Sequence, residues 1–183
     1  MTFLVWEAAT KWRELKMRDG NVCLPLMVNQ LCADAERTKR IGELLLKLAG
    51  EGRRIIALSD RVAHLEALQK MVQPRLKEGE EAAMYVAKTT REEREKAESA
   101  RILLSSWTMS KEGLDIPALD TLVMCSPKAD VEQGVGRILR RREGKGDPWV
   151  IDVVDPTSIF FRLHRKRSSF YTSQGYSPET ESL

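Results

Sequence analysis

Short, nearly continuous apolar runs alternate with amphipathic segments from Gly52 onward. The apolar runs have the length of strands, and their unbroken character is typical of parallel strands covered by helices on both faces. The alternation of such strands with helical segments indicates an α/β domain with a largely parallel sheet. Five strands are predicted, at residues 54–58, 83–86, 101–105, 121–125 and 149–154.

The helical segments show the periodicity of helices that bury one face. A helix is predicted from Asp34 to Ala49, with apolar residues at the i, i+3, i+4, i+7 spacing, and Gly50 would end it. Ser59 or Asp60 is the candidate N-cap of the next helix. Thr90 and Glu93 form a capping box in front of a short, exposed helix.

The two ends of the chain give weaker patterns. The apolar residues 3–6 are typical of a short strand, residues 8–17 of a helix, and Asp19-Gly20 of a turn. Near the C-terminus, residues 176–183 are rich in Ser, Glu and Pro, which predicts a frayed tail.

Composition narrows the class of protein. The chain has 183 residues, enough for one domain with a real core. No apolar run approaches the roughly 20 residues of a membrane span, and no export signal is recognisable. Cys23, Cys32 and Cys125 form no close pair, which is typical of reduced thiols in the cytoplasm or nucleus. His64 and His164 lie far apart in the sequence, so no metal site is expected.

Charge is spread unevenly, although the net charge is only +3. Dense basic clusters occupy residues 137–142 and 162–167. Such clusters are expected of a surface that meets phosphates, but a solvated helix face gives the same pattern, and charge alone leaves both open.

The first basic cluster has an ordered arrangement. Gln133, Arg137 and Arg140 are spaced i, i+4, i+7, so on a helix they share one narrow stripe suited to phosphate oxygens. Gly134 and Gly136 would each cost about 1 kcal/mol relative to Ala in a helix interior, which favours a helix whose backbone approaches a ligand closely. A surface helix with incidental glycines is the alternative.

The loop after the strand at 101–105 carries a second set of polar groups: Ser106, Glu112, Gly113 and Asp115. In open α/β sheets, ligands bind beyond the carboxyl ends of the strands. The residues alone do not distinguish a binding loop from a loop with a helix cap.

The order and separation of these segments resemble the C-terminal half of superfamily 2 helicases. Residues 106–117 look like motif V, and the Gln-x-x-Gly-Arg-x-x-Arg pattern at 133–140 matches motif VI. Residues 54–68 look like motif IV with its helix. Glu36-Arg37 resembles the Glu-Arg helix of the UvsW-like and large-DNA-virus branch, which suggests an intracellular protein of cellular, viral or phage origin.

The resemblance implies a single RecA-like α/β domain, with a mostly parallel sheet of five or six strands and helices on both faces. Residues 24–176 would form this domain. Residues 1–23 would connect it to an N-terminal lobe, and residues 177–183 would be a flexible tail.

The resemblance also implies roles for single residues. In that family two RecA-like lobes close on ATP with Mg²⁺, and arginine fingers of the C-terminal lobe stabilise the charge that develops on the γ-phosphate. By position, Arg140 would be the primary finger and Arg137 the second, and Gln133 would couple the γ-phosphate to the acidic motif of the other lobe. The expected ATP-binding residues are Glu112, Gly113, Asp115 and Gly136, and the expected nucleic-acid contacts are Ser59, Asp60, Arg61, His64, Ser106 and Thr108.

Two parts of a complete motor are missing from the sequence: the Gly-x-x-x-x-Gly-Lys-Ser/Thr loop and the acidic Mg²⁺-binding motif. We therefore expect a domain of a longer protein, or one subunit of a split motor, that hydrolyses ATP poorly alone. Its expected partners are an N-terminal RecA-like lobe and nucleic acid, with DNA favoured over RNA but both left open. The alternatives are a non-enzymatic RecA-like binding or docking module and a metal-dependent nuclease, for which a clustered carboxylate site is lacking.

Overall fold

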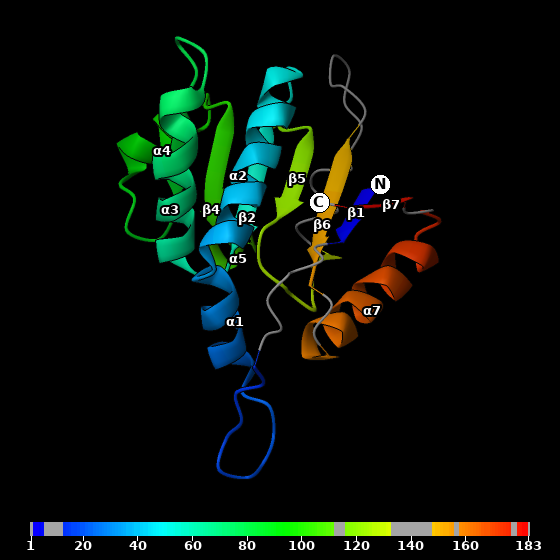
Figure 1. The fold of residues 1–183 in the computed structure, drawn as a ribbon. Coiled ribbons are helices and arrows are strands. Elements are labelled where there is room, and N and C mark those ends of the chain that lie inside the picture. The colour runs from blue at the N-terminus through cyan, green and yellow to red at the C-terminus, as the bar shows by residue number, and fades with distance from the viewer. Residues whose placement is uncertain are drawn as a thin grey trace.

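The computed structural model describes residues 2–5, 13–111, 116–132, 148–155, 158–176 and 179–182. Over these residues the chain forms one parallel sheet with helices on both faces (Figure 1). The strand order is β3-β4-β2-β5-β6-β1-β7, and every neighbouring pair is parallel. The strands are β1 (Thr2–Val5), β2 (Ile55–Ser59), β3 (Ala82–Tyr85), β4 (Ile102–Ser106), β5 (Thr121–Met124), β6 (Trp149–Val154) and β7 (Glu179–Ser182).

The five strands predicted from the apolar runs are β2 to β6, each within one residue of its predicted bounds. The RecA-like fold class is thereby confirmed, but the terminal segments extend the sheet beyond the expected five or six strands. β1 pairs with β6 along its whole length, and β7 pairs with β1. Residues 179–182 form a strand, although the stretch 176–183 was expected to be frayed. The sequence did not indicate this strand, because backbone pairing to an open sheet edge needs no hydrophobic pattern.

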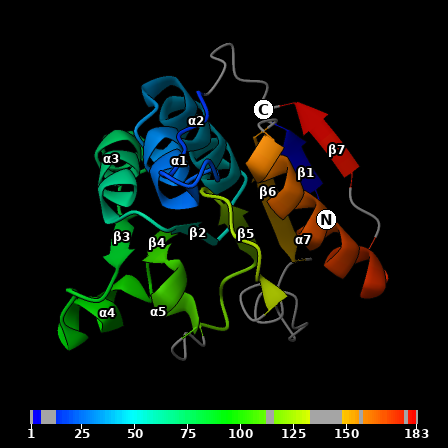
Figure 2. The same cartoon turned by 90° about the horizontal axis from the view of Figure 1, so that it is seen from below.

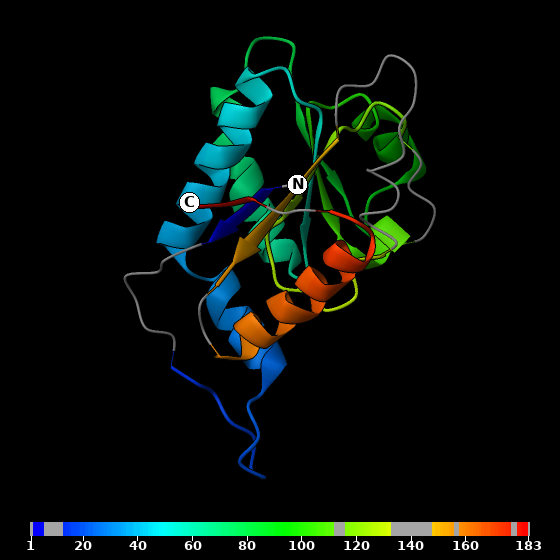
Figure 3. The same cartoon turned by 90° about the vertical axis from the view of Figure 1, so that its right-hand side faces the viewer.

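Helices cover the two faces of the sheet (Figure 2). α2 (Ala35–Gly50) and α3 (Val62–Val72) pack on one face. α4 (Arg91–Ala97), α5 (Trp107–Lys111) and α7 (Ser158–Ser173) pack on the other. α1 (Leu24–Cys32) packs against the beginning of α7, below the sheet in Figure 3. None of the helices in the described ranges is long and apolar enough to cross a membrane.

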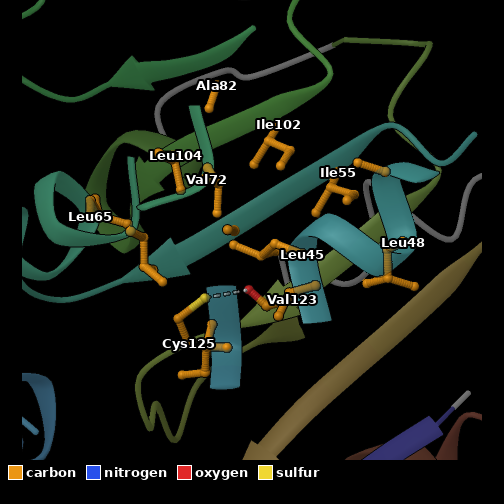
Figure 4. Packing of buried hydrophobic residues seen from close by; sticks show 14 of the residues in the cluster. Leu45, Leu48, Ile55, Leu65, Val72, Ala82, Ile102, Leu104, Val123 and Cys125 are labelled. Carbon is orange, nitrogen blue, oxygen red and sulfur yellow. Dashed lines mark hydrogen bonds between the residues drawn. The ribbon is translucent and has the colours of Figure 1, made fainter. Parts of the chain in front are cut away.

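The core has one layer on each face of the sheet. Leu45, Leu48 and Leu65 from the two covering helices meet Ile55, Ile102 and Val123 from three strands, as Figure 4 shows. On the opposite face, Trp107 of α5 and Tyr171 of α7 pack against apolar residues of the same strands. Both rings are almost completely buried, so α5 and α7 are fixed to the sheet by the hydrophobic effect of large aromatic groups.

Helix ends agree with the sequence in two places and differ in one. The Asp34 side chain accepts a hydrogen bond from the backbone N–H of Arg37 at 2.6 Å, which caps α2. The Thr90–Glu93 capping box of α4 is present with both hydrogen bonds. The N-cap of α3 is Arg61, without a side-chain cap, and neither Ser59 nor Asp60 occupies that position.

The segment before α1 differs from its prediction over residues 13–17. Helix was expected there, but Lys16 forms an antiparallel bridge with Val22. The predicted turn at Asp19-Gly20 lies between them, and Gly20 has a φ of 84°, which L side chains rarely adopt. The bridge closes this turn, so the segment is extended and not helical.

Candidate functional site

The carboxyl ends of four strands meet at one edge of the sheet. Because β2, β4, β5 and β6 are parallel, the segments that follow them all leave at this edge, where α/β proteins bind their ligands. Ser59 at the end of β2 and Ser106 at the end of β4 are directly opposite each other in the ladder. The segments expected to touch nucleic acid and ATP therefore start side by side.

The turn after β2, residues 59–64, begins with a buried polar pair. Ser59 is completely buried, and its Oγ lies 3.0 Å from Nδ1 of His64 and accepts the backbone N–H of Arg61 at 3.3 Å. The Sγ of Cys32 in α1 lies 3.8 Å from the same Oγ. Burial, with a smaller contribution from the charge of Arg37, lowers the pKa of His64 to about 3, so its imidazole is neutral at pH 7.

These positions correct part of the expected nucleic-acid site. Ser59 is 0% exposed and His64 is 1% exposed, so neither side chain faces solvent where a nucleic-acid strand would lie. Their hydrogen bonds are directed at each other and at the turn. Both residues stabilise the turn through buried hydrogen bonds. The sequence of the motif does not show whether a serine or a histidine in it is buried or exposed.

Asp60 and Arg61, at the middle of the turn, are partly exposed. The Asp60 carboxylate accepts a hydrogen bond from Nζ of Lys128 at 3.0 Å, and its backbone N–H donates to Oγ of Ser126 at 2.8 Å. The Arg61 guanidinium donates to Oδ1 of Asn29 and to the Pro25 carbonyl, both in α1. The turn is thus held from two sides and keeps one cation near the surface.

The turn after β4 is built differently. Ser106 is partly exposed, and its Oγ accepts the backbone N–H of Met109 at 3.3 Å, in the first turn of α5. Thr108 is exposed, whereas Trp107 between them is 2% exposed and anchors the helix in the core. Ser106 and Thr108 therefore present hydroxyls at the surface of the same edge, where solvent reaches them.

The connection after β5, residues 125–132, leads to the expected arginine fingers. It contains no helix or strand from Cys125 to Val131, and Ser126 within it is buried. Two buried arginines hold it. Arg37 donates to the Cys125 carbonyl at 2.7 Å, and Arg167 donates to the Lys128 carbonyl at 2.6 Å.

Each of these arginines also grips an aspartate. Arg37 binds both carboxylate oxygens of Asp155, at 2.8 and 2.9 Å, and Arg167 binds both oxygens of Asp152, at 2.7 and 2.8 Å. Burial raises the pKa of Asp155 in spite of Arg37. The pKa of Asp152 lies below its ordinary value. Burial alone would raise it, but the interactions with Arg167 and His164 lower it by more.

Arg167 corrects the interpretation of the second basic cluster. It is 1% exposed and is committed to Asp152 and the Lys128 carbonyl, so it is not part of a phosphate-facing surface. Arg162, Arg165 and Lys166 of that cluster are exposed. The sequence shows four cations within residues 162–167, but only the helical phase of α7 relative to β6 shows which one points inward.

The expected ATP contacts lie outside the described residues. This holds for the motif V residues Glu112, Gly113 and Asp115 and for the motif VI residues Gln133, Gly136, Arg137 and Arg140. The framework that carries them is described. α5 leads into the first set and the connection after β5 into the second, and both follow strands that end at the same sheet edge.

Among the described residues, no group of three or more His, Cys, Asp or Glu side chains could hold a metal ion. The carboxylates of the C-terminal edge are bound by cations of the chain itself: Asp60 by Lys128, Asp155 by Arg37 and Asp152 by Arg167.

Comparisons with known proteins agree with this geometry. The model of the family described as "Helicase conserved C-terminal domain" matches residues 36–142, more than half of the chain. A putative ATP-dependent RNA helicase of Acanthamoeba polyphaga mimivirus is 29% identical over 151 residues, which cover 82% of this chain. The match spans only 29% of that viral protein.

Solved structures show the same fold. T4 UvsW superposes with a TM-score of 0.70 at 17% identity, over 99% of this chain and 40% of UvsW. The C-terminal domain of the DEAD-box protein Dbp5 superposes with a TM-score of 0.65 at 14% identity, over all of this chain and 90% of that domain. The chain belongs to the helicase conserved C-terminal domain family, and its fold is that of a RecA-like C-terminal domain.

Proposed function

We propose that this chain is the C-terminal motor lobe of an ATP-dependent helicase or translocase, and that it works with an N-terminal RecA-like lobe on nucleic acid. The family match supports the helicase context. The observation that carries the proposal is the common edge: the turns after β2 and β4 and the connection after β5 leave the sheet together. One closing motion of two lobes can therefore act on nucleotide and nucleic acid at once.

In this proposal motif VI performs the chemistry of the lobe. Arg140 is the primary arginine finger, Arg137 is the second, and Gln133 couples the γ-phosphate to the acidic motif of the other lobe. A guanidinium suits this role because it is always charged and presents several N–H donors in a rigid plane. Such fingers accelerate phosphoryl transfer by about 10³–10⁵ in related systems. ATP with Mg²⁺ would be bound between the lobes, with Glu112, Gly113, Asp115 and Gly136 on this side.

The proposed nucleic-acid contacts are Asp60, Arg61, Ser106 and Thr108, at the ends of β2 and β4. Arg61 supplies a cation, the two hydroxyls can donate to phosphate oxygens, and Asp60 holds the turn in place through Ser126 and Lys128. Ser59 and His64 act indirectly, since they are buried and hold the turn. These are contacts to a backbone that DNA and RNA share. The viral relative is named an RNA helicase, so the expectation of DNA is tested against RNA.

The test is ATP turnover by this chain alone and by the chain combined with an N-terminal lobe, each with and without an oligonucleotide. We expect little turnover by the chain alone and stimulated turnover by the combined lobes. Arg140→Ala should reduce the stimulated turnover by about 10³ or more. Arg165→Ala, which removes an exposed cation of α7, is the matched control and should leave turnover unchanged.

The outcomes separate the proposal from its alternative. Vigorous turnover by the chain alone would contradict the motor-lobe proposal, because the chain would then hold a complete ATP site. If the two lobes associate but turnover stays absent with DNA and with RNA, the non-enzymatic binding or docking module becomes the better account. Stimulation by only one of the two polymers would decide the substrate class.

A further inference from the structure

The connection after β5 is held from the two faces of the sheet by the same device. Arg37 belongs to α2 on one face, and Arg167 belongs to α7 on the other. In each arginine, Nε and one terminal nitrogen donate to an aspartate, which is Asp152 within β6 or Asp155 just after it. The other terminal nitrogen donates to a backbone carbonyl of the connection. Two independent copies of one pattern, both on residues 125–128, indicate that the interactions of these two arginines fix the path of this stretch.

The same connection is tied to the turn after β2. The Lys128 ammonium pairs with the Asp60 carboxylate at 3.0 Å, and the Ser126 hydroxyl accepts the Asp60 N–H at 2.8 Å. Cys125 also donates its N–H to the Leu58 carbonyl at 2.9 Å, next to the turn. A displacement of Asp60 must therefore either move residues 126–128 or break these hydrogen bonds.

From these contacts we propose that Arg37, Arg167, Ser126 and Lys128 are positioning residues that couple nucleic-acid contact at the turn after β2 to the motif VI arginines. This inference rests on the proposed function. Arg37 and Arg167 hold the two ends of residues 125–128 rigidly against β6. Ser126 and Lys128 transmit the position of the turn to this stretch, which continues into Gln133.

Stability alone does not account for the arrangement. Buried ion pairs are weak evidence for stability, because apolar residues of similar volume often replace them at no loss of stability. An apolar pair, however, would leave the Cys125 and Lys128 carbonyls without their buried guanidinium donors. Since the stretch has no strand or helix of its own, these donors determine where it lies.

The sharpest test uses Lys128→Met and Ser126→Ala in the combined two-lobe motor, with a fluorescent oligonucleotide as the probe. Neither residue is a proposed contact to ATP or nucleic acid, and Lys128 keeps its backbone carbonyl for Arg167. We expect basal ATP turnover to stay within about twofold of wild type. Stimulation by the oligonucleotide should fall about fivefold in Lys128→Met, the equivalent of one half-buried ion pair. Oligonucleotide affinity should change less than twofold.

Two controls accompany these variants. Lys128→Arg keeps a cation within reach of Asp60 and should retain the stimulation. Lys88→Met breaks a lysine–carboxylate pair of the same kind, Lys88–Glu66 at 2.7 Å, which lies away from the connection, and it should also keep full stimulation. Arg167→Lys retains the charge but loses the planar fork, and it should combine lost stimulation with reduced stability.

The outcomes separate two failures. If wild type is stimulated and Lys128→Met keeps the full stimulation ratio, the coupling inference is wrong while the motor proposal stands. If wild type shows no stimulation with any oligonucleotide, the motor proposal fails and takes this inference with it. Lost stimulation together with an equal loss of oligonucleotide affinity would also overturn the inference, since Lys128 would then act as a direct contact.

Discussion

Two turns of this domain start from the same place and are built for different tasks. β2 and β4 are neighbours, and each ends in a serine at the same level of the ladder, Ser59 and Ser106. Ser59 is completely buried and its hydroxyl is occupied by His64 and a backbone N–H. Ser106 is partly exposed, and its hydroxyl accepts only a long hydrogen bond at the start of α5.

The difference comes from what packs over each turn. α1 lies on the turn after β2, where Asn29 and Pro25 accept from the Arg61 guanidinium and Cys32 approaches Ser59. α1 makes no such contact with the turn after β4 in the described part of the chain. One turn is therefore a fixed part of the framework, and the other leaves its hydroxyls exposed to solvent. The same residue type at the same register position serves folding in one case and remains available for binding in the other.

The largest expected effect comes from breaking the framework that holds the first turn in place. Arg37→Leu leaves the buried Asp155 without its partner, and the loss of one member of a buried pair costs about 3–5 kcal/mol. Urea unfolding should show this loss. Replacing both residues by Leu should recover a large part of it, because no unpaired charge remains. Hydrogen exchange should accelerate in residues 59–64 more than in residues 106–111.

A result within 1 kcal/mol of wild type for Arg37→Leu would contradict this account of the framework. Equal acceleration of hydrogen exchange in residues 59–64 and 106–111 would contradict the difference between the two turns. It would mean that Arg37 stabilises both turns to the same extent.

The second expected effect is a pH dependence that belongs to the turn after β2. The folded-state pKa of His64 is lowered to about 3, whereas an unfolded histidine titrates near 6.5, so between these values only the unfolded chain binds the proton. Stability from this group is thus fully present above pH 6.5 and is lost as pH falls, by about 1.4 kcal/mol per pH unit.

Urea unfolding at pH 7, 6 and 5 measures this slope above the ordinary pKa range of carboxylates. His64→Gln disturbs the buried hydrogen bond to Ser59, so it should be less stable than wild type at pH 7. Because glutamine cannot take up a proton, the stability of this variant should be nearly independent of pH over this range. A slope that survives unchanged in His64→Gln would assign the pH dependence to other groups.

The third expected effect compares the two serines directly. Ser59→Ala leaves the buried Nδ1 of His64 and the N–H of Arg61 without their partner, which should cost about 1–3 kcal/mol. Ser106→Ala removes one long hydrogen bond that solvent can replace, so it should cost about 0.5 kcal/mol or less. Thermal or urea unfolding of the two variants side by side gives the comparison, and equal losses would contradict it.

Much of this fold is predictable from local pattern. The strands β2 to β6 are short apolar runs, and both capped helices, α2 and α4, show the capping residues and spacing that the structure uses. β7 was not predictable in this way, because its residues, Glu-Thr-Glu-Ser, pair through their backbone alone. The turn before α1 was recognisable, but the helix expected at residues 13–17 is replaced by a bridge.

The site was predictable as a set of segments and not as a set of exposed side chains. Motif order indicated which segments meet at the sheet edge, since parallel strands end there together. Whether a given side chain faces solvent depends on α1 and α7, which pack from distant parts of the sequence. That is why Ser59 and His64, expected as nucleic-acid contacts, are buried, and why Arg167, in a cluster expected at the surface, is buried as well. The roles of the motif V and motif VI residues remain predictions.

The smallest expected effect tests whether the exposed turn is the one that binds. Thr108→Ala removes a surface hydroxyl without disturbing the buried Trp107 beside it, so stability should stay within about 0.5 kcal/mol of wild type. Oligonucleotide affinity should fall about threefold, the low end of the net contribution of one hydrogen bond, because this hydroxyl is exposed to solvent. The salt dependence should be unchanged, because no cation is lost, whereas Arg61→Ala should reduce the slope of log affinity against log salt by about 1. If Thr108→Ala binds like wild type while Ser59→Ala loses affinity at full occupancy of the folded state, the binding role would belong to the buried turn, and the division of tasks between the two turns would be reversed.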